Sequence, residues 1–166
     1  MKKKHKDALA AALGNIAALT ARVEHLERGN RINVTPLVKQ GRRNWVLPLK
    51  PGESFEWADL NYKCRVTRTK WMGTLCGYVG VGDWHPAYGK DYTWTGFEGI
   101  AVHGGLTFSG EMENDPGRRW WLGYDCAHFN SGGMDEAACR IECEDLVLQL
   151  SRLECEHLKE KLEAKS

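Results

Sequence analysis

Three short segments of the chain hold the residue types that form metal sites, acyl-transfer sites and anion-binding sites. They are residues 83–90, 102–107 and 119–128. The candidate ligand-binding residues that they contribute are His85, Tyr88, His103, Gly104, Gly105, Arg119, Trp121, Cys126 and His128. None of these segments has the spacing of a motif with an established mechanism. The sequence therefore predicts a site more clearly than it predicts a reaction.

Cys126 and His128 are the first candidates for catalysis, with His103 as the third. On a strand over residues 119–127 and its continuation, alternation puts Cys126 and His128 on one face, about 7 Å apart along the chain. A Cys–His nucleophile also needs a third group that orients the histidine. These residues favour a Cys/His-dependent hydrolase as the alternative to a binding protein, and whether the chain is an enzyme stays open at this point.

Zinc is a second chemical interpretation of the same residues. Three imidazoles and one thiolate, from His85, His103, Cys126 and His128, would make an N₃S ligand set of the kind that zinc accepts. The Cys-x-His spacing is not one of the common zinc signatures. The structural alternative is a buried Cys126 that packs as a small apolar residue, with histidines that make core hydrogen bonds. We therefore expect no resident metal and no other cofactor, with zinc as the alternative.

The run His103-Gly104-Gly105 is the candidate anion site. Two glycines after a histidine let the backbone turn sharply and present N–H groups to a phosphate or carboxylate, with Arg118 or Arg119 nearby. A plain hairpin turn is the alternative. Because titratable side chains are costly to bury without partners, we expect one cleft with this turn as its floor and Trp84 or Trp121 as its wall. The side chains expected to converge there are those of His85, Tyr88, His103, Cys126 and His128.

Charge and cysteine content exclude some classes of protein. The chain has 166 residues and a net charge of +1, with 11 Lys/Arg against 3 Asp/Glu in residues 1–50. No segment approaches the roughly 20 apolar residues of a membrane span, so we expect no membrane partner. The net charge by itself excludes neither a nucleic-acid nor a protein partner, and we do not expect a nucleic-acid partner. The six cysteines form no Cys-x-x-Cys pair and no export signal precedes them, which predicts a cytoplasmic protein with reduced thiols and no disulfide.

A helix near the N-terminus is expected to mediate self-association. Residues 7–28 have apolar side chains at alternating steps of three and four, as a short coiled coil does. We therefore interpret residues 1–29 as an oligomerising helix that makes the protein a homo-oligomer. Residues 30–53 are interpreted as a basic, extended linker.

The remaining residues, 54–166, are expected to form an α+β domain. It would have a central antiparallel β-sheet and a C-terminal helix over residues 134–163, packed through Leu146, Leu150 and Leu153. The alternating patterns and the turn signals between them predict strands over residues 62–71, 73–81, 98–103, 105–109 and 119–127.

Several of these segments resemble a family of small uncharacterised proteins from phages and bacteria, over roughly residues 70–155. The motifs that carry the resemblance are Cys76-Gly77-Tyr78-Val79-Gly80-Val81 with His85-Pro86-Ala87-Tyr88-Gly89-Lys90, then Val102-His103-Gly104-Gly105-Leu106-Thr107-Phe108, then Trp121-Leu122-Gly123-Tyr124-Asp125-Cys126-Ala127-His128. The resemblance implies a phage setting and the host cytosol. Small phage proteins sequester host signalling nucleotides or bind host proteins. We therefore expect a protein that sequesters a small anionic ligand such as a nucleotide signal of host defence, with an inhibitor that binds a host protein as a further alternative.

Overall fold

The computed structural model describes residues 48–113, 115–127 and 134–164. The chain divides into two compact units, Met1–Pro48 and Leu49–Ser166, and the description that follows concerns the second unit. The predicted helix at residues 7–28, most of the predicted linker at residues 30–53, and His128 lie outside the described residues. Self-association through residues 7–28 therefore stays a prediction.

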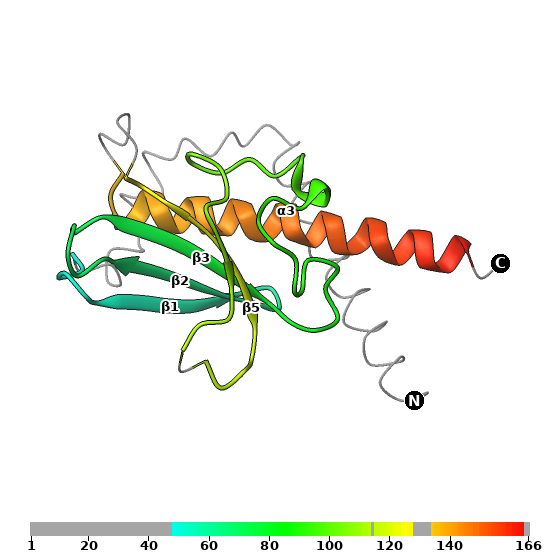
Figure 1. Ribbon diagram of the computed structural model, residues 1–166, viewed down its shortest axis with the longest axis horizontal. Helices are drawn as coiled ribbons and strands as arrows, with labels where there is room; N and C mark the ends of the chain where they lie inside the picture. The colour runs from blue at the N-terminus through cyan, green and yellow to red at the C-terminus, as the bar shows by residue number, and fades with distance from the viewer. Residues whose placement is uncertain (1–47, 114, 128–133, 165–166) are drawn as a thin grey trace, which may run out of the picture. The chain divides into compact units, whose positions relative to one another are not determined.

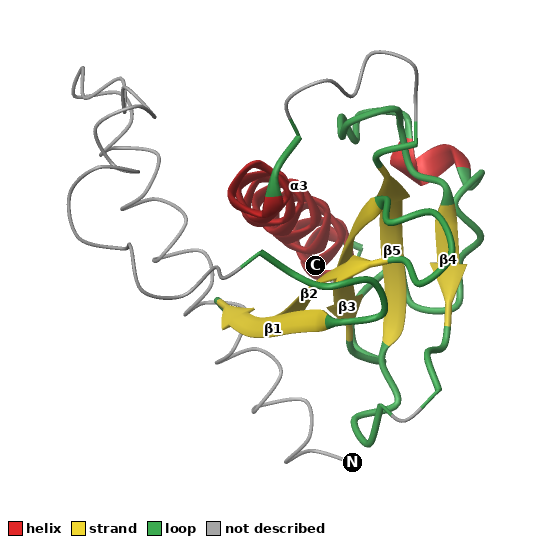
Figure 2. Cartoon of the chain, turned by 90° about the vertical axis from the view of Figure 1, so that its left-hand side faces the viewer, coloured by secondary structure: helices red, strands yellow, loops and turns green. Residues whose placement is uncertain are grey.

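The described chain forms a five-stranded antiparallel sheet with one long helix packed against it (Figures 1 and 2). The order of the strands across the sheet is β1-β2-β3-β5-β4. The elements are β1 Ser54–Asp59, β2 Tyr62–Arg68, β3 Leu75–Val81, the 3₁₀ turn η1 Thr95–Phe97, β4 Phe108–Gly110, β5 Trp120–Asp125 and α3 Glu136–Glu163. The predicted α+β class, with an antiparallel sheet and a C-terminal helix, is confirmed.

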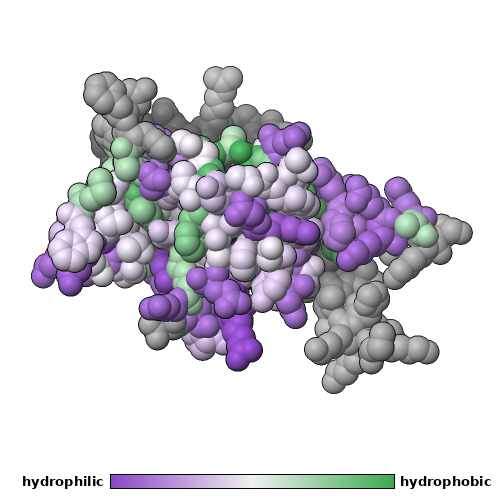
Figure 3. Space-filling view, in the orientation of Figure 1, coloured by the Kyte–Doolittle hydropathy of each residue, from purple (hydrophilic) through white to green (hydrophobic). Residues whose placement is uncertain are grey.

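Helix α3 is buried on one face in its first half and largely exposed in its last turns. Its last turns extend to the right in Figure 1, and in Figure 3 the surface there is strongly hydrophilic. Glu156, Lys159 and Glu160 are among the exposed residues of these turns. Within the described part of the chain, no helix combines the length and the apolar character that a membrane crossing requires.

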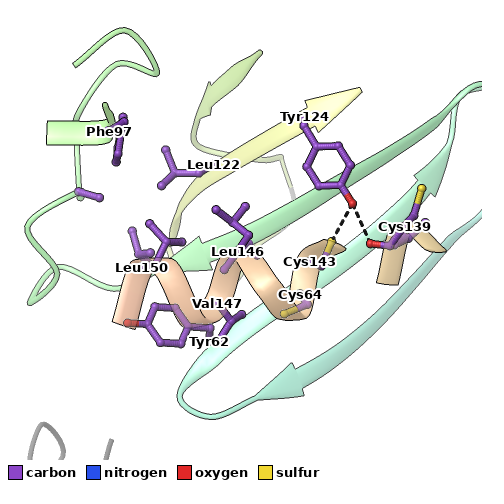
Figure 4. Packing of buried hydrophobic residues seen from close by; sticks show 14 of the residues in the cluster. Tyr62, Cys64, Phe97, Leu122, Tyr124, Cys139, Cys143, Leu146, Val147 and Leu150 are labelled. Atoms are coloured by element: carbon purple, nitrogen blue, oxygen red, sulfur yellow. Dashed lines mark hydrogen bonds between the residues drawn. The ribbon is translucent and has the colours of Figure 1, made fainter. Parts of the chain in front are cut away.

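The first half of α3 forms the core with the sheet (Figure 4). Cys139, Cys143, Leu146, Val147 and Leu150 are fully buried and recur at helical spacing on one face. They pack on alternate, inward-facing residues of the strands, which are Tyr62, Cys64, Val66, Leu75, Val79, Val81, Leu122 and Tyr124. The predicted packing of α3 through Leu146 and Leu150 is confirmed, and Leu153 packs partly buried at the edge of the same cluster.

Two glycines in the sheet make room for two tyrosines on the neighbouring strand. Gly77 of β3 is paired with Tyr124 of β5, and the next pair in the register reverses the arrangement, with Tyr78 facing Gly123. A Cβ atom on Gly77 would lie 2.4 Å from the hydroxyl oxygen of Tyr124, and one on Gly123 would lie 2.3 Å from the ring of Tyr78. Successive residues point to opposite faces, so each face of the sheet holds one tyrosine laid across a glycine.

Most of the predicted strands exist, with three differences. The strands expected over 62–71, 73–81 and 119–127 correspond to β2, β3 and β5, and the one expected over 105–109 is the shorter β4, displaced toward its C-terminal side. The strand expected over residues 98–103 is wrong. Those residues form a loop whose backbone at Ala101 bonds to the Gln149 side chain of α3: Ala101 N donates to Oε1 at 2.6 Å, and Nε2 donates to Ala101 O at 2.8 Å.

Strand β1 was not predicted. It pairs with β2 through a two-residue turn formed by Leu60 and Asn61, and Leu60 has a φ of +52°. Such turns usually carry Asn-Gly or Asp-Gly, because a positive φ strains other side chains. The turn therefore lacks the sequence signal that would have marked the end of β1.

The glycine–tyrosine packing predicts a position-specific loss of stability. Gly77→Ala should lower the free energy of unfolding by about 1–3 kcal/mol, because the new methyl group overlaps the buried and hydrogen-bonded Tyr124 ring. Gly99→Ala is the matched control, since a Cβ there meets no atom within 4 Å. Urea unfolding of both variants measures the difference. Equal stability of the two variants would contradict this account of the sheet.

Candidate functional site

His85 lies in the core, just beyond the end of β3. Only 3% of it is exposed. The Ala87 amide donates to Nδ1 at 3.0 Å, so Nε2 carries the proton and donates to the Leu150 carbonyl of α3 at 3.0 Å. Burial lowers the pKa of His85 from 6.5 to about 4. Both ring nitrogens are thus engaged within the fold, and the imidazole is neutral at physiological pH.

Cys126 follows β5 and contacts the first turns of α3. It is 8% exposed, and its Sγ lies 3.4 Å from Sγ of Cys139. Cys139 and Leu150, the helix residues that contact Cys126 and His85, are 11 positions apart, or about 16 Å along the helix axis. A shared catalytic or zinc site requires Cys126 and His85 to lie close together. The structure does not bring them together.

The turn at residues 102–105 has the sharp geometry that its glycines predict. Gly105 N donates to Val102 O at 2.9 Å, and Gly104 and Gly105 have φ angles of +69° and +84°. The amide of His103 donates to Oε1 of Glu142 on α3 at 2.6 Å. A backbone N–H of the predicted anion site thus binds a carboxylate, but this carboxylate belongs to the chain itself.

Trp121 and Arg119 belong to a different cluster, centred on Asp115. Trp121 is fully buried on the face of the sheet opposite to Leu122 and Tyr124, with the Arg65 guanidinium 4.9 Å from its ring centroid. Its indole Nε1 donates to Asp115 Oδ2 at 3.0 Å, and Arg119 Nη1 donates to Asp115 Oδ1 at 2.8 Å. Asp115 is a hub that the sequence analysis missed, although an Asp-Pro-Gly turn beside a tryptophan-rich strand could have indicated it.

The electrostatics of Asp115 fit a structural role. Burial alone would raise the pKa of its carboxyl, but the amides of Arg119 and Gly117, the Trp121 indole and the Arg119 charge outweigh burial and hold the pKa below its usual range. A carboxylate with this many internal donors fixes the loop between β4 and β5.

Tyr88 contacts the residues on either side of Arg119. Its hydroxyl donates to the Arg118 carbonyl at 3.4 Å, and its ring lies 6.3 Å from that of Trp120. The expected single cleft is therefore divided among separate places in the fold, with His128 outside the described residues. Among the residues that the structure describes, no group of three or more His, Cys, Asp or Glu is arranged to hold a metal ion.

Among the residues that the structure describes, the most exposed large apolar side chains lie at the tip of the β2–β3 hairpin, residues 69–74, which we call the hairpin tip. Trp71 is 91% exposed and Met72 is 78% exposed. The hairpin tip lies at the left-hand end of the molecule in Figure 1. The sequence pattern predicts residues 69–71 as the end of a strand, and therefore does not indicate these two side chains as a site. Their signal was an apolar pair between a lysine and a glycine.

The backbone of the hairpin tip is held by several hydrogen bonds. Thr69 N donates to Thr74 O at 2.8 Å, and Thr74 N donates to the Thr69 hydroxyl at 3.0 Å. Arg68 Nη1 donates to Gly73 O at 2.6 Å, and Gly73 has the positive φ of +64° that its place in the turn requires. These bonds fix the loop on which Trp71 and Met72 are presented.

The buried His85 predicts a specific loss of stability in mild acid. In the unfolded chain the imidazole binds a proton below pH 6.5, whereas in the folded chain it does so only near pH 4. Its contribution is therefore complete above pH 6.5 and is lost as the pH falls from 6.5 toward 4. Between pH 7 and pH 5 the free energy of unfolding should fall by about 2 kcal/mol.

Urea unfolding of the wild type and of His85→Gln at both pH values tests this assignment. The variant keeps an N–H donor for Leu150 O but has no titrating ring, so its stability should change much less between pH 7 and pH 5. A wild-type slope that persists unchanged in His85→Gln would show that another group is responsible.

Comparisons with protein-family models, with curated proteins and with solved structures found no match to this chain. Its function therefore has to be argued from its own residues.

Proposed function

We propose that this protein is a non-catalytic binding module that recognises another protein through the hairpin tip. The observation that carries the proposal is the nearly complete exposure of Trp71 and Met72 side by side on a hydrogen-bonded loop. The core of the domain makes no use of either side chain. Tryptophan is the residue type most enriched among side chains that dominate the affinity of protein interfaces.

The rigidity of the hairpin tip supports binding. Ordering a loop during association costs free energy, and a loop that is already fixed by its own hydrogen bonds avoids much of that cost. Arg68 links the hairpin tip to the helix as well, since its Nη2 lies 2.6 Å from Oε1 of Glu136. The indole is thus presented from a frame that is anchored in the body of the domain.

Charge indicates the chemistry of the partner. The Nζ atom of Lys70 lies 5.8 Å from the centroid of the Trp71 ring. The turn that contains Lys50 lies beside Lys70, since Gly52 N donates to Arg68 O at 2.8 Å and a Cβ on Gly52 would lie 3.9 Å from Lys70 Cβ. The same turn also carries Glu53, whose carboxylate accepts from Lys50 N at 2.8 Å, so the complementary surface is an apolar pocket with a carboxylate at the edge nearest Lys70. A lipid bilayer fits less well, because even a whole myristoyl chain gives only marginal membrane binding, and two side chains bury less apolar surface than such a chain.

Hydrolysis has less support than binding in the described residues. Both ring nitrogens of His85 and the sulfur of Cys126 already have partners inside the fold. The cytoplasmic location, within a host cell for a phage protein, is part of the same proposal.

The test is a capture experiment followed by a quantitative measurement. Wild type, Trp71→Ala and the control Tyr92→Ala are used to capture proteins from a cell lysate, and Kd is then measured with the purified partner. Tyr92 is also an exposed aromatic residue, with 42% of it accessible, but it lies far from the hairpin tip in sequence. Trp71→Ala should weaken binding about thirtyfold or more, as expected for loss of a dominant interface side chain. Tyr92→Ala should have little effect.

Two outcomes would overturn the proposal. One is a partner that binds Trp71→Ala as tightly as it binds the wild type. The other is Trp71-dependent binding to vesicles of anionic phospholipid, with no protein partner that distinguishes the variants. Circular dichroism of each variant confirms that the fold is retained, which is expected because Trp71 and Tyr92 are not part of the core.

A small anionic ligand at residues 102–105 is a second candidate. The observation in its favour is that the His103 amide already binds a carboxylate oxygen, that of Glu142. An incoming phosphate would have to replace this oxygen, so Glu142→Ala should bind a nucleoside triphosphate more tightly than the wild type does. Glu142→Gln keeps an oxygen acceptor and should resemble the wild type. Calorimetric titration that detects no binding to either protein would exclude this candidate.

A further inference from the structure

Two buried thiols lie in contact where β5 ends and α3 begins. The Sγ atoms of Cys126 and Cys139 are 3.4 Å apart. The backbone on each side is held in place, since Cys126 N donates to Leu75 O at 2.9 Å and Cys139 N donates to Asp135 O at 3.0 Å. The two sulfurs are therefore kept together by the sheet and by the first turns of the helix.

We propose that Cys126 and Cys139 form a redox-active dithiol, which a hydroperoxide oxidises to an intramolecular disulfide. This modification site is independent of the hairpin tip and of the partner proposed for it.

The two cysteines are not equivalent. Cys126 is 8% exposed, whereas Cys139 is fully buried. The hydrogen bond from the Cys139 thiol lowers the pKa of Cys126, against the opposing effects of burial and of the Asp125 and Glu142 charges. The same bond and burial raise the pKa of Cys139. Cys126 is therefore the thiol that reacts first, and Cys139 is the one that resolves the product.

The neighbouring thiol on the helix has other partners. Cys143 lies 3.7 Å from the Tyr124 hydroxyl and 4.0 Å from the Arg65 carbonyl, and its pKa is raised to about 12, chiefly by burial. It is one helical turn beyond Cys139 (Figure 4).

The reaction balances with the hydroperoxide as the sole oxidant. The Cys126 thiolate attacks one peroxide oxygen, the O–O bond breaks, and the alcohol or water of the peroxide leaves, so that Cys126 becomes a sulfenic acid. The Cys139 sulfur then attacks the Cys126 sulfur, and the S–O bond breaks. The hydroxide leaves as water with the proton of the Cys139 thiol. Two electrons have passed from the dithiol to the peroxide.

The small exposure of Cys126 favours a small oxidant. A hydroperoxide needs access to one sulfur lone pair, whereas a bulky disulfide such as glutathione disulfide must align three sulfur atoms during exchange. Oxidation by hydrogen peroxide should therefore be faster than oxidation by glutathione disulfide.

The sequence offers a direct readout. Trypsin cleaves after Arg119 and after Arg140, so Cys126 and Cys139 are the two cysteines of one tryptic peptide, residues 120–140. After treatment of the folded wild type with hydrogen peroxide, this peptide should lose both alkylatable thiols and the mass of two hydrogen atoms. Alkylation is the primary readout, because Met134 in the same peptide also takes up oxygen.

The peptide with Cys155, residues 153–159, provides the internal control. Cys155 is a half-buried thiol on the same helix, and burial raises its pKa. The dithiol peptide should react about tenfold faster than the Cys155 peptide, because of its lower thiol pKa and its resolving partner. In Cys139→Ser, Cys126 should stop at the sulfenic or sulfinic acid, which a sulfenic-acid probe detects.

Three results would overturn the proposal. The first is a peptide of residues 120–140 that stays doubly alkylated while Cys155 is oxidised. The second is a disulfide that forms as fast in urea-unfolded protein, since the fold would then not position the thiols. The third is a disulfide that forms with glutathione disulfide but not with hydrogen peroxide, which would identify a different class of oxidant.

Discussion

The structure depends on the burial of one face of α3 against β2, β3 and β5. That face carries Cys139 and Cys143 in its first turns and the larger aliphatic residues Leu146, Val147 and Leu150 after them. All five side chains are inaccessible to solvent. Each large aliphatic side chain contributes about 1.5–3 kcal/mol on burial. An isolated helix as polar as the last turns of α3 would be marginal in water, so this contact is also what keeps the helix formed.

The same helix fixes the rest of the domain, because the surrounding segments bond to successive positions along it. Its residues that hold other segments are, in order, Glu136, Cys139, Glu142, Gln149, Leu150 and Glu154. Two histidine-containing segments are among those held, one at Glu142 and one at Leu150. The polar residues that suggested a cleft are therefore largely attachment points for loops. A buried polar group needs a partner, and in this fold the partner is supplied by the helix and not by a ligand.

The class of the fold and the role of α3 could be predicted from the sequence, because an amphipathic spacing over more than seven helical turns leaves few other interpretations. Strand β1 could not be predicted, because its turn at Leu60 has a positive φ without a glycine to mark it. The sequence also could not show whether His85 and Cys126 lie close together, because their distance depends on which turn of α3 each one contacts. Alternation on β5 says which face a side chain occupies but not how far along the helix its partner lies.

The hairpin tip and the Cys126–Cys139 dithiol are both attached to the first two turns of α3. Glu136 holds Arg68, which in turn holds the Gly73 carbonyl of the hairpin tip. Cys139 follows Glu136 by three residues, on the next turn of the helix. Glu136 lies at the rim of the core, whereas Cys139 is fully buried in it, like the following residues from Cys143 to Leu150 on the same face. The recognising side chains lie on the hairpin and the reactive thiols lie where β5 meets the helix, so both depend on how the first turns of α3 are held against the sheet.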